Sequence, residues 1–150
     1  MRRLGFLPLI TALVVAGALL FVRADACVAA TAQDGVFIHV SHGADDPHRL
    51  LMAFKMAVTM AEAGHPVLVY CDVKAVTVLA DGAADVTLAP FPSAHTQLKR
   101  MLELGIRVRA CPTCLKVAGI GEDQLVKGVK AANRDEFFAF ASGRILSLDY

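Results

Sequence analysis

The chain has 150 residues, which is enough for one domain with its own hydrophobic core. Apolar residues make up 56% of it and the mean hydropathy is +0.54, which excludes an intrinsically disordered chain. The 15 basic residues are balanced by 14 acidic ones, so the composition argues against a strongly basic nucleic-acid binder.

The apolar excess is concentrated at the start of the chain, where 23 of the first 32 residues are apolar. Arg2 and Arg3 give this segment a positive start, and residues 4–22 form an uncharged run of mostly Leu, Val, Ala and Phe. Two sites with small residues at alternate positions follow, at 24–26 and 30–32. This layout predicts a secretory signal peptide.

We therefore predict a signal peptide at residues 1–32 and one domain at residues 33–150, located in the periplasm or otherwise exported. The alternative is that the run at 4–22 is retained as a membrane anchor, since it is long enough to span a bilayer. Without the signal peptide the domain has 12 basic and 13 acidic residues. That near-neutral balance provides no long-range field for binding nucleic acid or another polyanion.

Beyond residue 32, short apolar runs rich in β-branched and aromatic residues alternate with helical patterns. The first helix has Asp45 or Asp46 as its cap and Pro47 at its first position. In chain order we expect a strand at 35–40, a helix at 47–63, a strand at 66–70, a short helix at 74–79, a strand at 85–88, a helix at 94–104, a strand at 106–110, short helices at 115–118 and 122–127, a strand at 129–130, a helix at 135–141 and a strand at 145–148.

This alternation predicts an α/β fold, a three-layer sandwich with an open, mostly parallel sheet flanked by helices. In such sheets ligands and reactive groups gather beyond the carboxyl ends of the strands. Three candidates lie there by sequence, each directly after or at the end of a predicted strand: His42, Cys71 and Cys111. For Cys71 two interpretations stay open, a small buried side chain or a thiol that faces Cys111.

The strongest chemical signal is the CxxC motif formed by Cys111, Pro112, Thr113 and Cys114. Its first cysteine ends a strand and its second opens a helix, whose unpaired amides stabilise a thiolate. Two sulfurs at this spacing can also close a disulfide, so that one resolves an adduct on the other. The alternatives are an inert structural disulfide, or a metal site completed by Cys71 and His42.

Histidines give a second, weaker signal. His42 could exchange a proton with a thiol at the same edge of the sheet, which makes it a candidate catalytic residue together with the cysteines. The alternative is that Asp45 and Asp46 cap the following helix and His42 is simply solvated. His39 lies inside the first strand and is expected to be a satisfied core or interface histidine. No phosphate loop or dinucleotide fingerprint is present, so we expect no cofactor.

Four segments together resemble the DsrE/DsrF-like family of small sulfur-relay domains. They are Ser41-His42-Gly43 before a helix, FPSAHTQLK at 91–99, ACPTCLK at 110–116 and GRILSLDY at 143–150. The resemblance implies an open parallel sheet, assembly as homotrimers or hexamers, and a persulfide carried on Cys111 between partner proteins. The better-known members are cytoplasmic, whereas this chain has a predicted export signal and a second cysteine.

Two hypotheses follow. The first is an exported sulfur carrier or sulfurtransferase that loads sulfane sulfur on Cys111, is resolved by Cys114 and is assisted by His42. Its partners would be sulfur donor and acceptor proteins or small sulfur compounds. The second is a non-catalytic binding or assembly module of the cell envelope, with a structural disulfide or a metal at the CxxC motif.

Overall fold

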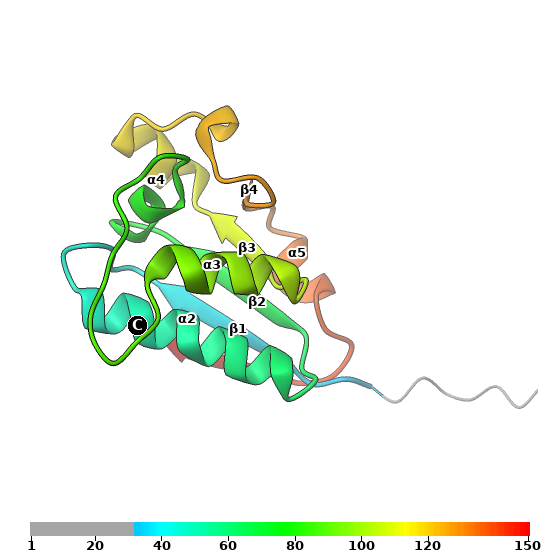
Figure 1. The fold of residues 1–150 in the computed structure, drawn as a ribbon. Helices are drawn as coiled ribbons and strands as arrows, with labels where there is room; N and C mark the ends of the chain where they lie inside the picture. The colour runs from blue at the N-terminus through cyan, green and yellow to red at the C-terminus, as the bar shows by residue number, and fades with distance from the viewer. Residues whose placement is uncertain (1–31) are drawn as a thin grey trace, which may run out of the picture. The chain divides into compact units, whose positions relative to one another are not determined.

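The computed structural model describes residues 32–150, which form a five-stranded sheet with its helices (Figure 1). The strands are β1 (Gly35–Val40), β2 (Val67–Cys71), β3 (Arg107–Ala110), β4 (Lys130–Ala131) and β5 (Ile145–Asp149). They lie in the order β4-β3-β2-β1-β5, and every neighbouring pair is parallel. The predicted signal peptide at 1–32, apart from Ala32, and the alternative anchor at 4–22 lie outside the described residues.

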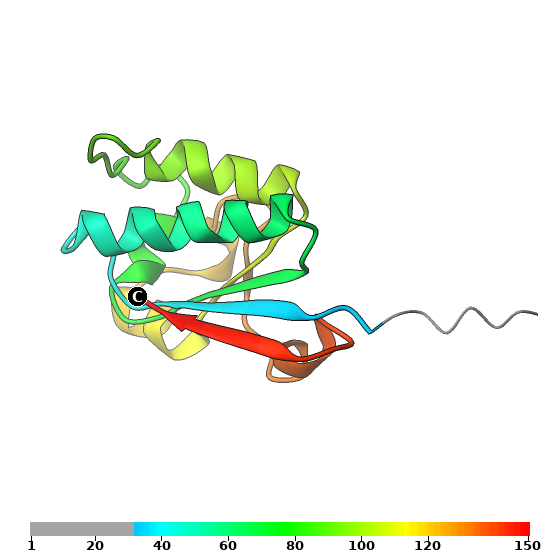
Figure 2. The same cartoon turned by 90° about the horizontal axis from the view of Figure 1, so that it is seen from below.

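Helices on both faces make the molecule a three-layer sandwich. They are α2 (Pro47–Glu62), α3 (Ala94–Glu103), α4 (Pro112–Ala118) and α5 (Glu136–Ala139), with 3₁₀ turns η1 (Ala75–Leu79) and η2 (Glu122–Gln124). Figure 2 shows α2 and α3 side by side on one face of the sheet and the short α5 on the other. The predicted fold class is thereby confirmed. Within residues 32–150, no helix has the length and apolar character needed to cross a membrane.

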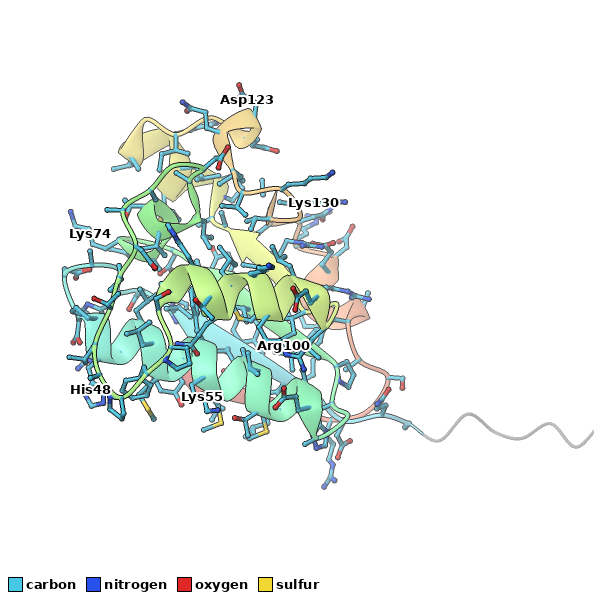
Figure 3. The ribbon with its side chains drawn as sticks, in the orientation of Figure 1. His48, Lys55, Lys74, Arg100, Asp123 and Lys130 are labelled. Carbon is cyan, nitrogen blue, oxygen red and sulfur yellow. The ribbon has the colours of Figure 1, made fainter. Side chains whose placement is uncertain are left out.

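The face under α2 and α3 contains the main core. Side chains alternate along a strand, so Val36 and Ile38 of β1 are buried in this core, whereas Phe37 and His39 face the opposite layer. On α2, apolar residues at helical spacing pack on the sheet, and Phe54 among them is fully buried. The exposed side chains of Lys55 on α2 and Arg100 on α3, labelled in Figure 3, lie on the outer side of this layer.

On the opposite face, α5 packs on the sheet through an aromatic side chain and an ion pair. The Phe137 ring packs edge-on against Phe37 and Tyr70, with centroid distances of 5.7 and 5.2 Å. The Arg109 guanidinium donates two hydrogen bonds to the Glu136 carboxylate, at 2.5 and 2.8 Å. This thin cover leaves the side chains near the carboxyl ends of β1 and β2 close to solvent.

The strand predicted at residues 85–88 is wrong, because this segment is a loop. Val86 is buried as an apolar strand residue would be, but its carbonyl accepts a hydrogen bond from the Ala94 amide at the start of α3. The neighbouring Asp85 side chain accepts from the His95 amide in the same way. These polar groups therefore cap a helix instead of joining a sheet.

Candidate functional site

The carboxyl ends of β1, β2 and β3 meet at one edge of the sheet, and the CxxC motif lies at this edge. The Cys111 amide donates to the Cys71 carbonyl at 2.8 Å, which keeps the start of α4 beside the end of β2. The Asp72 amide donates to the Val40 carbonyl at 3.0 Å and connects β2 to β1 in the same way. Lys74 marks this edge in Figure 3.

Cys111 caps α4, and its half-buried thiol is the more acidic of the pair. The helix begins at Pro112, three residues earlier than predicted, so the amides of Thr113 and Cys114 are free to donate to the Cys111 sulfur. Burial opposes ionisation of Cys111. Hydrogen bonds from the Tyr70 hydroxyl, from Cys114 and from the Thr113 amide outweigh burial and lower the pKa of the Cys111 thiol. This arrangement favours the thiolate of Cys111 over that of Cys114.

Cys114 is the complementary thiol, which keeps its proton. Burial raises its pKa, and a negatively charged Cys111 sulfur and Asp72 carboxylate raise it further. These effects outweigh the Val73 amide, which donates to Cys114 Sγ at 3.2 Å. The two cysteines therefore differ in acidity, since the pKa of the Cys111 thiol is lowered and that of the Cys114 thiol is raised.

Val73 sits beside this pair in a strained backbone conformation. Its φ is +43°, a left-handed value that β-branched residues rarely adopt. The conformation aims the Val73 amide at Cys114, while the side chain stays 58% exposed. Strain of this kind is typical of functional sites.

Replacing Val73 by Asn should raise the free energy of unfolding by about 1 kcal/mol, because Asn tolerates the left-handed region and little apolar burial is lost. Urea unfolding measures the effect. Val117→Asn is the matched control, since Val117 is 86% exposed on α4, and it should change stability by less than about 0.5 kcal/mol. A destabilised Val73→Asn would show that the strain carries no energetic cost.

Cys71 does not join the pair. Its side chain is fully buried in the main core, and burial raises the pKa of its thiol strongly. This agrees with the interpretation of Cys71 as a small apolar residue. The three cysteines within residues 32–150, Cys71, Cys111 and Cys114, are free thiols in the structure. Among the residues that the structure describes, no cluster of three or more His, Cys, Asp or Glu side chains could hold a metal ion.

His42 lies at the same edge but contacts other groups. Its Nε2 is 3.1 Å from Arg49 Nη1 and accepts from it, because arginine can only donate. Its Nδ1 therefore donates to Asp45 Oδ2 at 3.0 Å. The loop has no room for a side chain at Gly43, where a Cβ would lie 2.7 Å from the Lys74 carbonyl oxygen. Among residues 32–150, no hydrogen bond joins His42 to a cysteine, and its catalytic role stays a prediction.

The sequence patterns missed three residues of this edge: Tyr70, Asp72 and Asp149. They surround His39, which was expected to be a satisfied histidine. Nδ1 of His39 is 3.0 Å from Asp149 Oδ1, its Nε2 is 3.0 Å from Asp72 Oδ2, and its ring stacks on Tyr70 with centroids 5.9 Å apart. One signal in the sequence could have found two of them, because Tyr70 and Asp72 flank the end of a predicted strand.

Comparisons with known proteins agree with this geometry. The sequence profile of the DsrE/DsrF-like family matches residues 34–143. The chain belongs to the DsrE/DsrF-like family. No curated protein matches the sequence. Members of this family act in sulfur relay with partner proteins, so a relay-type function is the starting point for this chain.

Two solved structures share the family's fold with this chain. The YchN protein from E. coli superposes with a TM-score of 0.62 at 17% identity, covering 77% of this chain and 100% of YchN. MTH1491 from Methanobacterium thermoautotrophicum, a protein of unknown function, gives a TM-score of 0.59 at 16% identity, covering 77% of this chain and 99% of its own. At these identities the likeness concerns the fold alone.

Proposed function

We propose that this protein carries sulfane sulfur as a persulfide on Cys111. The observation that carries the proposal is the setting of that thiol, which lies at the carboxyl edge of the sheet and receives hydrogen bonds that favour its thiolate. A thiolate takes the terminal sulfur of a polysulfide by attacking it and displacing the shortened polysulfide anion. Membership of a sulfur-relay family supports the same chemistry.

Cys114 resolves the adduct in this proposal. Its sulfur attacks Cys111 Sγ, closes a disulfide between the two cysteines and releases the outer sulfur in reduced form. Access is available on the Cys114 side, where Val73, Lys74, Thr77, Cys114, Val117 and Ala118 line a hollow of about 370 Å³. Its lining suits a small sulfur compound or the apolar part of a partner protein.

The cellular setting is proposed from the sequence. A signal peptide at residues 1–32 would place the domain in an exported compartment, where the CxxC motif needs a reductant to return to the dithiol state. Donor and acceptor proteins or small sulfur compounds would be the partners, and a homotrimer or hexamer the assembly. The N-terminal residue of the mature protein decides whether the first segment is removed.

Mass spectrometry after incubation with polysulfide tests the proposal. The reduced wild-type domain should gain about 32 Da for each sulfur atom added, or lose about 2 Da where Cys114 has already closed the disulfide, and Cys111→Ser should do neither. Cys71→Ala is the matched control, since its thiol is buried in the core, and it should load as the wild type does. An unmodified wild type, or equal loading of Cys111→Ser, would overturn the proposal. A bridge between Cys111 and Cys114 that resists reduction would then favour the binding module.

A further inference from the structure

The hollow beside Cys114 has a positive charge from Lys74. Among residues 32–150, its other lining side chains are apolar except for the Thr77 hydroxyl and the Cys114 thiol, and no carboxylate lines it. Asp72 directly precedes the lining residue Val73 in the chain but does not belong to the lining. The Asp72 carboxylate contacts a residue outside the hollow, since its Oδ2 lies 3.0 Å from the ring of the histidine in β1. The lining of the hollow therefore suits an anion.

The main chain of Lys74 is held in place, whereas its ammonium group has no ion-pair partner within residues 32–150. The Lys74 amide donates to the Ser41 carbonyl at 3.1 Å. The Lys74 carbonyl accepts from the Thr77 hydroxyl at 2.8 Å and from the Thr77 amide at 3.2 Å. The loop therefore brings to the hollow a positive charge that the fold of this part of the chain does not use.

Two exposed valines of the hollow favour an organic occupant. Val73 is 58% exposed on the loop after β2, and Val117 is 86% exposed on α4. Because both line the hollow, a ligand with an apolar part would remove their side chains from water. The volume of about 370 Å³ is within the range of sites that hold organic molecules, about 300–1,000 Å³. An inorganic polysulfide has no apolar part that could use these contacts.

The reactive cysteines lie at this hollow. Cys114 lines it, and the Cys114 side chain hydrogen-bonds the Cys111 sulfur. A molecule in the hollow therefore meets the pair from its Cys114 side. The same hollow thus combines a reactive sulfur pair, an apolar surface and one positive charge, which are the three features that a charged organic sulfur compound needs.

We propose that the sulfur donor is a small organic persulfide with a carboxylate, bound in this hollow with its carboxylate at Lys74 and its apolar part on Val73 and Val117. This inference rests on the proposed function and names the class of donor for it. The charge of Lys74 favours the acid over a neutral donor of the same shape, and the two valines favour it over inorganic polysulfide. Lys74 is thereby a residue that determines donor specificity.

The loading step balances without another reactant. The Cys111 thiolate attacks the outer sulfur of the persulfide, R–S–SH, and forms a bond to it. The bond between the two donor sulfurs breaks, and the organic thiolate, R–S⁻, leaves with the electron pair. The proton stays on the outer sulfur. Cys111 Sγ is oxidised and the inner sulfur of the donor is reduced, so that a persulfide on Cys111 and a free thiolate are the products.

Donors that differ in charge but share the reacting sulfurs test this inference. The full-length reduced protein is mixed with an excess of N-acetylcysteine persulfide, of the persulfide of its methyl ester, or of inorganic polysulfide. Mass spectrometry follows the loss of the reduced form, and the rate that remains in Cys111→Ser is subtracted. The ratio of the acid rate to the ester rate then reports the contribution of the carboxylate.

Lys74→Gln should lower this ratio about threefold, because it removes a solvent-exposed ion pair with the donor. Lys74→Arg should keep the ratio, since it keeps the charge. A salt concentration of about 1 M should lower the ratio in the wild type, because salt screens exposed charges. Lys55→Gln is the matched control and should leave the ratio unchanged, since Lys55 lies on α2 and does not line the hollow (Figure 3).

Val117→Asn tests the apolar contact in the same assay. It should slow loading by both organic persulfides about threefold, because they cover apolar surface on α4. Loading by inorganic polysulfide should stay at the wild-type rate in this variant. Val117 is 86% exposed, so its replacement leaves the core intact.

The outcomes separate this inference from the proposed function. It is overturned if Lys74→Gln keeps the wild-type ratio, or if Val117→Asn loads both organic donors at the wild-type rate. It is also overturned if the protein gains the mass of the whole organic donor, because the inner sulfur has then been attacked. If polysulfide loads Cys111 and neither organic donor does, persulfide carriage stands and the hollow is left to a partner protein. A wild type that no donor loads overturns the proposed function itself.

Discussion

Replacing Tyr70 by Phe should raise the pKa of Cys111 and slow its alkylation about threefold on the acidic side of that pKa. The hydroxyl of Tyr70 is one of the hydrogen-bond donors that favour the Cys111 thiolate. Burial raises the pKa of Tyr70, and the neighbouring cysteine raises it further, so the phenol stays a protonated donor. A hydrogen bond to a charged group contributes about 1.5–3 kcal/mol, so losing this donor should raise the pKa of Cys111 measurably.

The threefold figure combines two opposing changes. A pKa higher by one unit reduces the thiolate fraction about tenfold below the pKa. Each remaining thiolate is more nucleophilic by about threefold, since nucleophilicity rises with basicity. The variant should therefore react more slowly at low pH and faster at high pH, where both thiols are ionised.

Alkylation by iodoacetamide as a function of pH measures both effects. The experiment uses a Cys114→Ser background, so that Cys111 is the accessible thiol within residues 32–150 and the coupling between the two cysteines is removed. Tyr150→Phe is the matched control, because this tyrosine lines the hollow at the same edge without acting on Cys111. If the midpoint of the Tyr70→Phe profile stays at the control value, then the Tyr70 hydroxyl does not stabilise the thiolate.

The position of the CxxC motif could be predicted from local patterns, whereas its environment could not. Cys111 follows a short apolar strand and precedes Pro112, and both signals depend on neighbouring residues alone. The donor Tyr70 is 41 positions away from Cys111, and it is brought there because β2 pairs with β3 in register. No periodicity in a single sequence specifies which strands become neighbours.

The same reason explains His39. Inside a strand it looks like a core residue, and one face of β1 is indeed core. Its partner Asp149 lies 110 residues later, and the two meet because β5 adds to β1 at the sheet edge. The strand predicted at 85–88 was wrong because no strand is free beside it to pair with. An apolar pattern gives a segment the right side chains for a strand, but it does not supply that neighbour.

Replacing Phe54 by Ala should lower the free energy of unfolding by about 3–5 kcal/mol. Phe54 is fully buried between α2 and the sheet, among the largest side chains of the core. Its removal loses the transfer free energy of the ring and leaves a cavity that the flanking strands cannot close, because they are fixed on both sides in the sheet. The total free energy of unfolding of a domain of this size is about 5–15 kcal/mol, so this loss is a large fraction of it.

Comparing urea unfolding of Phe54→Ala with that of Phe138→Ala separates the effect of burial on stability from the effect of removing a phenylalanine side chain. Phe138 is 82% exposed on α5, and its replacement should change stability by less than about 0.5 kcal/mol. Equal losses in the two variants would contradict the assignment of the core to the face under α2 and α3. At urea concentrations below the unfolding transition of Phe54→Ala, iodoacetamide should still alkylate Cys111 of this variant at the wild-type rate. The groups that act on Cys111 come from β2 and from the start of α4, and none of them belongs to α2.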